Sequence, residues 1–199
     1  MKSLQAESVH KAVRAAVHEA EAMLARLPEV HLDLYSIVGA CAESLKGGHK
    51  VFFCGNGGSA AESQHLATEF VVRLSSIRER KALPALALTT DTSLLTACGN
   101  DYGFDRIFAR QVEAHLTKGD VLILLSTSGK SPNLLFAAKE ARARGGVVVA
   151  FLGGSKTPLD ELCDFTLHIP SSASQRVQEG HLMCGHLLVE LVESALFDN

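Results

Sequence analysis

His65 and Glu69 form a pair of side chains whose types and spacing could do chemistry. Residues four apart share one face of a helix, so the imidazole and the carboxylate would stand together there. They could act as a general base with its partner, as two metal ligands, or as a solvated ion pair. Arg73, four residues further on, could pair with Glu69 or reach an anionic ligand. The spacing alone leaves these alternatives open.

A glycine-rich loop precedes this pair. An apolar run enters Gly55-Asn56-Gly57-Gly58-Ser59, and a helical pattern follows over 59–73, with Ser59 placed to start the helix. Glycines let the backbone approach a ligand closely, and the free N–H groups of a first helical turn attract anions. The sequence therefore predicts that a phosphorylated ligand is held against His65 and Glu69.

A second polar loop, 126–132, crowds four hydroxyl groups into six residues: Ser126, Thr127, Ser128 and Ser131. Hydroxyl groups and helix-terminal N–H groups can wrap a phosphate, and Lys130 adds positive charge nearby. The alternative is a polar turn with a serine N-cap. The chain lacks the complete glycine motifs of nucleotide-binding loops, so we expect a sugar phosphate and no nucleotide cofactor.

Polar residues also interrupt the apolar pattern of the predicted last helix, 174–196, at Gln178, His181 and His186. A core histidine satisfied by hydrogen bonds would explain any one of them, but the group together indicates a site. Gln178 and His186 would lie about 12 Å apart along a straight helix. One metal ion or substrate carbon could contact both only if the helix begins after Gln178 or two chains contribute, which points to a subunit interface.

Loop residues elsewhere could bind sugar hydroxyls. Asn100 and Asp101 fall in a predicted break at 99–103, and Asp91 follows the second predicted strand. Each could equally cap a helix, and Asp91 before Thr92 is expected to be such a cap.

Five short apolar runs separated by helical patterns must position these residues. Continuous apolar strands that alternate with helices predict an α/β fold, a five-stranded doubly wound parallel sheet of flavodoxin-like order 2-1-3-4-5. Two extra helices precede it and a long helix ends it. The expected strands are 50–54, 85–88, 121–125, 147–152 and 165–169, and the expected helices are 3–27, 32–46, 59–73, 93–114 with a break, 131–144, 158–163 and 174–196. Ligands of such sheets bind at the carboxyl edge between the first and third strands, where the two polar loops would meet.

Length and composition predict one domain over 1–199, with a helical extension at 1–47 used in oligomer packing and an α/β core at 48–199. A net charge of −3 gives no footprint for nucleic acid. The sequence shows neither a signal peptide nor a membrane span, so we expect a cytoplasmic protein. Five scattered cysteines indicate neither a disulfide framework nor a cysteine zinc site.

Several motifs together resemble the sugar isomerase (SIS) domain proteins and, within them, the bacterial phosphoheptose isomerases. They are Cys54-Gly55-Asn56-Gly57-Gly58-Ser59, Asn100-Asp101-Tyr102, Gly119-Asp120-Val121-Leu122, Ser126-Thr127-Ser128-Gly129-Lys130-Ser131 and Arg176-Val177-Gln178-Glu179. The resemblance implies a phosphosugar isomerase of carbohydrate metabolism. It would convert sedoheptulose 7-phosphate to D-glycero-D-manno-heptose 7-phosphate through an enediol, for ADP-heptose, lipopolysaccharide or related heptose biosynthesis.

The resemblance also implies a cytoplasmic homotetramer with active sites between subunits, without direct contact to nucleic acid or membrane. The acid and base would be Glu69 and His186. Zinc, where bound, would be held one per site by His65, Glu69, Gln178 and His186. The substrate would contact Asn56, Gly57, Gly58, Ser59, Glu69, Arg73, Asn100, Asp101, Ser126, Thr127, Ser128, Ser131 and Gln178.

A related replication regulator, which binds the DnaA initiator as a tetramer, has the same fold and lacks the catalytic set. Glu69, Gln178 and His186 are all present here, which favours the enzyme. The end of the chain, 196–199, is similar to the end of the regulator, so DnaA binding without catalysis is the alternative.

Overall fold

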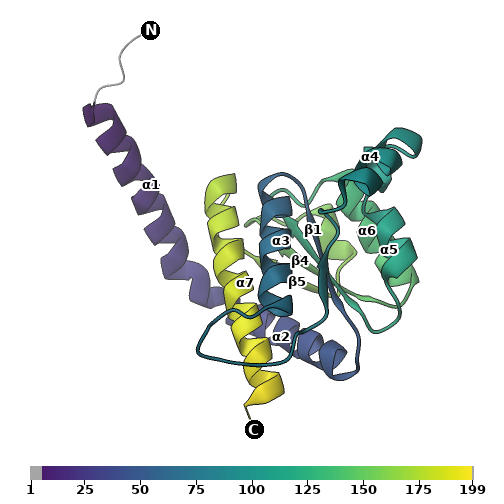
Figure 1. The fold of residues 1–199 in the computed structure, drawn as a ribbon. Coiled ribbons are helices and arrows are strands. Elements are labelled where there is room, and N and C mark those ends of the chain that lie inside the picture. Colours follow the sequence, from purple (N-terminus) through teal and green to yellow (C-terminus); the bar gives the residue numbers. More distant parts are fainter. Residues whose placement is uncertain (1–5, 199) are drawn as a thin grey trace.

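The computed structural model describes residues 6–198, and its centre is a five-stranded parallel sheet (Figure 1). The strands are β1 (Val51–Gly55), β2 (Ala85–Ala87), β3 (Val121–Ser126), β4 (Val147–Leu152) and β5 (Phe165–His168), in the order β2-β1-β3-β4-β5. Every neighbouring pair is parallel, and Phe53, Ile123 and Val149 stand side by side across the three central strands. The expected doubly wound fold is confirmed.

Helices cover both faces of this sheet. They are α1 (Ala6–Arg26), α2 (His31–Lys46), α3 (Gly58–Val71), α4 (Thr92–Asp101), α5 (Ala109–His115), α6 (Pro132–Ala143) and α7 (Ser174–Phe197), with short 3-10 helices at Leu27–Val30, Phe104–Arg106 and Pro158–Glu161. Phe53 and Phe151 pack with α2, α3 and α7, whereas Phe52 and Leu124 pack with α4, α5 and α6. Side chains alternate between the faces of a strand, so burial of both faces explains the continuous apolar runs.

The ends of two helices differ from the sequence expectation. Gly57, with φ at +58°, is the N-cap of α3, so the helix begins at Gly58 and Ser59 lies buried within its first turn. A positive φ of this kind favours glycine over serine. Helix α3 ends at Val71, so Arg73 lies beyond the helix. Asn100 and Asp101 are the last residues of α4, and the break follows them.

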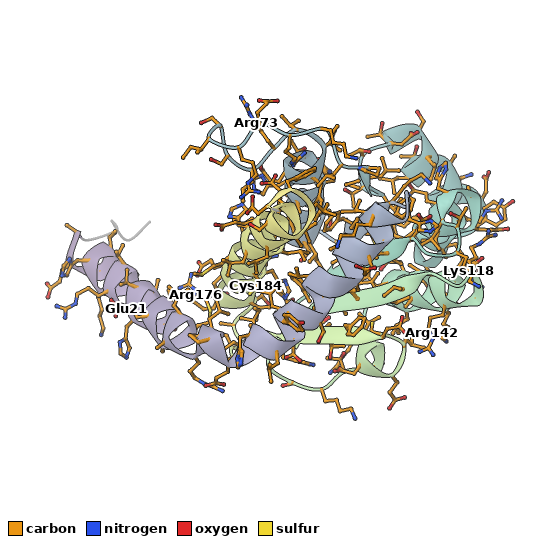
Figure 2. The ribbon with its side chains drawn as sticks, turned by 90° about the horizontal axis from the view of Figure 1, so that it is seen from below. Glu21, Arg73, Lys118, Arg142, Arg176 and Cys184 are labelled. Atoms are coloured by element: carbon orange, nitrogen blue, oxygen red, sulfur yellow. The ribbon has the colours of Figure 1, made fainter. Side chains whose placement is uncertain are left out.

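Helix α1 extends away from the rest of the chain (Figures 1 and 2). Met23 is its one buried residue, and Val9, Val13 and Val17 are 42–56% exposed although they form one apolar stripe. The contact nearest its middle comes from Arg176 of α7, whose Nη1 donates to the Ala16 carbonyl at 2.7 Å. Such a stripe requires a partner surface that the described chain does not itself supply.

All five cysteines are free, and four of them are buried, as expected of small apolar residues. Within residues 6–198, no helix has both the length and the apolar character of a membrane span.

Candidate active site

Helices α3 and α7 lie side by side in parallel, and their contact brings residues from distant parts of the sequence together (Figure 1). Gly58 contacts Gln178 near the start of both helices, and His65 contacts His186 further along. Between the helices, a Cβ at Gly185 would collide with the side chain of Leu66. A residue other than glycine at 185 would therefore push the helices apart and separate the two histidines.

The central contact of this helix pair joins two imidazoles and a carboxylate. The Nε2 atoms of His65 and His186 lie 2.7 Å apart, and the rings meet edge to face. On the other side of the His65 ring, Nδ1 lies 3.7 Å from Oε1 of Glu69. One Nε2 must donate and the other accept, so the contact holds one proton between the rings. The Glu69–His65–His186 row can therefore deliver and receive protons at a ligand.

Gln178 lies at a different place along the helix pair. It is well inside α7, about 12 Å from His186 along the helix axis. Its amide packs so closely over Gly58 that a Cβ on that glycine would strike it. Within one chain Gln178 therefore belongs with the glycine loop, and it does not reach the Glu69–His65–His186 row.

The donor types of the row suit zinc, which takes imidazole nitrogen and carboxylate oxygen as ligands. His65 and His186 already face each other through Nε2, and Glu69 lies one helical turn from His65. Within the described part of one chain, no three His, Cys, Asp or Glu side chains form a cluster that could hold a metal ion. The expected four zinc ligands are therefore not gathered around one point within the described part of one chain.

The two polar loops lie side by side, as the strand order predicts, because β1 and β3 are neighbours. A pair of amide hydrogen bonds joins them: Asn56 Nδ2 donates to Asn133 Oδ1 at 3.0 Å, and Asn133 Nδ2 donates to Asn56 Oδ1 at 2.8 Å. Asn133 is buried in the first turn of α6. This residue was not predicted as part of the site, and it fixes the orientation of the Asn56 side chain.

The hydroxyl groups of the second loop differ in whether they already make hydrogen bonds within the protein. Ser126 is buried, and its Oγ accepts from the Gly129 N–H at 2.9 Å, so this serine shapes the loop. Ser128 is exposed and makes one long contact of 3.4 Å with the Lys130 N–H. Ser131 occupies the N-cap position of α6 without a side-chain cap hydrogen bond. The hydroxyls of Ser128 and Ser131, beside the N-terminus of α6, are thus open to a ligand.

Four other predicted residues have identifiable surroundings. Arg73 does not pair with Glu69: its Nη1 lies 2.6 Å from Glu79 Oε2 instead, because α3 has already ended. Asn100 donates to Asp101 at 2.8 Å on the exposed end of α4. Asp91 accepts from the Leu94 N–H and caps α4, as expected.

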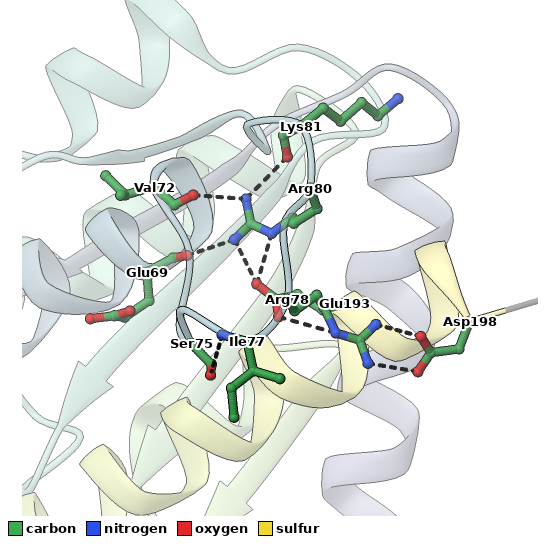
Figure 3. Close-up of polar contacts among 9 residues, drawn as sticks. All are labelled: Glu69, Val72, Ser75, Ile77, Arg78, Arg80, Lys81, Glu193 and Asp198. Carbon is green, nitrogen blue, oxygen red and sulfur yellow. Dashed lines mark hydrogen bonds and ion pairs between the residues drawn. The ribbon is translucent and has the colours of Figure 1, made fainter.

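The far end of α3 is held by a buried ion pair. Arg80 Nη2 lies 2.7 Å from Glu193 Oε1 of α7, and both side chains are almost inaccessible to solvent. The same guanidinium donates to the main-chain carbonyls of Glu69, Val72 and Lys81 (Figure 3). Arg80 thus satisfies carbonyl groups that the end of a helix leaves without intrahelical partners. Neither partner was singled out in the sequence, although Glu193 is a charge on the apolar face of α7.

A hollow of about 600 Å³ lies away from these residues, between α1 and the N-terminal end of α7. Arg176 and Glu19 line it, together with Ser171 and Ser172. Arg176 pairs with Glu179 and has its Nη1 3.9 Å from Glu19, so its charge is already balanced. None of the predicted site residues lines this hollow. We therefore locate the candidate site by its side chains, at the glycine loop and the α3–α7 contact.

Known proteins are similar to this chain in sequence and in fold. The SIS domain family matches residues 16–153. A phosphoheptose isomerase of Burkholderia pseudomallei (strain 1710b) is 53% identical over 161 residues, 81% of either protein, and one of Rhodospirillum rubrum is 47% identical over 184 residues, 92% of this chain and 97% of that protein.

The solved structure of a phosphoheptose isomerase from Neisseria gonorrhoeae is 35% identical, with a TM-score of 0.88 over 94% of this chain and 99% of that one. The corresponding structure from Francisella tularensis is 33% identical, also with a TM-score of 0.88. The expected resemblance is confirmed, and the chain belongs to the SIS-domain phosphoheptose isomerase family.

Proposed function

We propose that this protein interconverts sedoheptulose 7-phosphate and D-glycero-D-manno-heptose 7-phosphate, and so supplies heptose biosynthesis. The observation that carries the proposal is the Glu69–His65–His186 row on the same helix pair that begins at the glycine loop. Conversion of sedoheptulose 7-phosphate by the purified full chain, with and without a chelator, tests it. We expect the aldose product to form. Absence of the product both with the chelator and after the protein is supplemented with metal would overturn the proposal.

The residue types agree with ketose–aldose exchange. A base must carry a proton between C1 and C2 of the sugar, and an acid must move a proton between the two oxygens. We assign the carbon-bound proton to Glu69 and the oxygen-bound proton to His186, with His65 holding the His186 ring through the Nε2 contact. Both duties need oriented groups that can exchange protons, and a carboxylate beside His65, which in turn contacts His186, supplies them.

We further propose one zinc ion per site, held by His65, Glu69, Gln178 and His186. Zinc would polarise the sugar carbonyl as a Lewis acid. The separation of Gln178 from His186 along α7 supports the idea that the amide comes from a second chain. The chain's own contribution is the pair of imidazoles already facing each other.

The substrate phosphate is assigned to the second loop. Ser128 and Ser131 have hydroxyls that are not used for capping, and both lie beside the N-terminus of α6. Asn56 to Ser59 would then hold the sugar nearer its reacting end, close to Gln178.

Replacing Ser128 and Ser131 together by alanine is expected to raise KM for the sugar phosphate, because two charge-assisted hydrogen bonds to the phosphate are lost. At roughly 1.5–3 kcal/mol for each bond to a charged group, the increase should exceed tenfold. Steady-state kinetics measure it, and Ser155→Ala, at an exposed serine outside this loop, is the matched control. A KM equal to that of the parent would remove the phosphate from this loop.

We propose that the chain assembles as a homotetramer through α1, with active sites between subunits. The exposed stripe of Val9, Val13 and Val17 supports this, because an isolated helix of this kind does not bury its own apolar face. Light scattering of the purified protein is expected to give four times the chain mass. Substituting all three valines by glutamine should lower the mass and the isomerase activity together, and an active monomer would contradict shared sites.

Binding of the DnaA initiator without catalysis remains the alternative function. It predicts capture of purified DnaA and no turnover of the heptose phosphate. The cytoplasmic location expected from the sequence likewise stays a prediction.

A further inference from the structure

Two buried polar atoms face each other between α3 and α7 without a hydrogen-bond partner. Oε2 of Glu62 and Nδ1 of His181 lie 4.0 Å apart, and neither makes a hydrogen bond in the structure. The His181 side chain is inaccessible to solvent, and that of Glu62 is 12% exposed. Leaving a buried polar group unsatisfied costs about 1–3 kcal/mol, so this pair requires an explanation.

The other ring nitrogen of His181 decides which atom can donate. Its Nε2 lies 3.2 Å from the Leu152 carbonyl oxygen at the end of β4, and a carbonyl only accepts. A neutral ring then carries its proton on Nε2 and presents a lone pair at Nδ1. An ionised Glu62 would also present only lone pairs. Two acceptors would therefore face each other in a buried place, unless one of the two residues holds a further proton.

Burial identifies the residue that holds it. Desolvation raises the pKa of Glu62 to about 7. Desolvation lowers the pKa of His181 to about 4, against a smaller upward effect of the Leu152 hydrogen bond. The pKa of Glu62 is the higher of the two, so a single proton shared by this pair resides on Glu62 and can be donated to the imidazole.

We propose that Glu62 is a positioning residue of the active site: its carboxyl group donates to His181 Nδ1 through one water across the 4.0 Å gap and so links α3 to α7. Glu62 lies three residues before His65, on the face of α3 that also carries Glu69. His181 lies between Gln178 and His186 on α7. The hydrogen bond thus fixes the helix pair beside the 2.7 Å contact of His65 with His186.

This inference rests on the proposed function only for its effect on catalysis. A displacement of about 1 Å between catalytic groups can cost as much as 100-fold in rate. Loss of the Glu62 hydrogen bond is therefore expected to act on kcat through the histidine pair, with little effect on KM, because Glu62 does not belong to the loop assigned to the phosphate.

The test compares Glu62→Gln with Glu62→Leu in the full chain. Glutamine is neutral and its amide still donates, whereas leucine has similar size and cannot donate. We expect Glu62→Gln to keep kcat near the parental value and Glu62→Leu to lower it roughly 10- to 100-fold. The matched control is Glu43→Leu, the same substitution at an exposed residue of α2. Equal loss of kcat in the Gln and Leu variants would overturn the positioning role.

A spectroscopic arm remains decisive even if no isomerase activity is found. In protein with ¹⁵N-labelled histidine, NMR should show His181 neutral, protonated on Nε2 and accepting a hydrogen bond at Nδ1. The Nδ1 signal should move toward that of a free imidazole nitrogen in Glu62→Leu and return in Glu62→Gln. A His181 protonated on Nδ1, or a signal unchanged by Glu62→Leu, would overturn the hydrogen bond itself, whatever the protein's activity.

Discussion

Glu69→Gln is expected to lower kcat for isomerisation about 10²- to 10⁴-fold, the range typical of losing a positioned base. The amide has the shape of the carboxyl group but cannot take a proton from the sugar carbon. The main-chain carbonyl of Glu69 accepts from Arg80 at 2.7 Å, and the substitution does not remove this contact, so the end of α3 should stay intact. The fold should therefore persist while the chemistry is lost.

The measurement is steady-state turnover of sedoheptulose 7-phosphate, with thermal unfolding to confirm the fold. Glu43→Gln is the matched control, because Glu43 is 77% exposed on α2 and lies outside the candidate site. This control should retain the parental kcat and midpoint. Turnover by Glu69→Gln at the parental rate would show that Glu69 is not the base, and an equal loss in Glu43→Gln would assign the effect to surface charge.

The sheet could be predicted from the sequence because its signal is local. Each strand is a short apolar run such as Val121–Leu125, and the alternation with helices leaves few topologies. The neighbouring positions of the two polar loops followed from that order, and the Asn56–Asn133 pair confirms it. Helix ends were less predictable. Helix α3 begins directly after Gly57, which has a positive φ. It ends at Val71, where Arg80 binds the carbonyl groups of the helix end.

The α3–α7 contact could not be predicted, because no local pattern encodes which residues of two distant helices meet. It depends on the absence of a side chain at Gly185, which lets Leu66 approach. Some signals were nevertheless present. Glu62 shares the helical face of His65 and Glu69, and Glu193 is a charge among the apolar residues of α7. A polar residue on a buried face needs a polar partner. Glu62 lies opposite His181, and Glu193 lies opposite Arg80.

Arg80→Met is expected to lower the free energy of unfolding by about 3–5 kcal/mol, the usual cost of breaking a buried ion pair by removing one partner. Glu193 is only 3% exposed and would keep only the longer contact with Arg78, whose Nε lies 3.9 Å from its Oε2, while the carbonyls of Glu69 and Val72 would lose their donor (Figure 3). Urea unfolding measures the change. The matched control is Arg110→Met, because the Arg110–Glu113 ion pair is exposed on both sides and its loss should matter far less.

The double variant Arg80→Met with Glu193→Met separates the ion pair from the helix cap. If the poorly compensated Glu193 charge dominates, removing both partners should be less destabilising than Arg80→Met alone, because methionine pairs pack without a desolvated charge. If the lost carbonyl donors dominate, the double variant should be at least as unstable as the single one. A loss in Arg80→Met no larger than in Arg110→Met would contradict both accounts. If Arg80→Met is destabilised in either way, we expect the end of α3 that carries Glu69 to unfold locally before the rest of the chain. Isomerase activity should then fall at lower urea concentrations than the global unfolding transition.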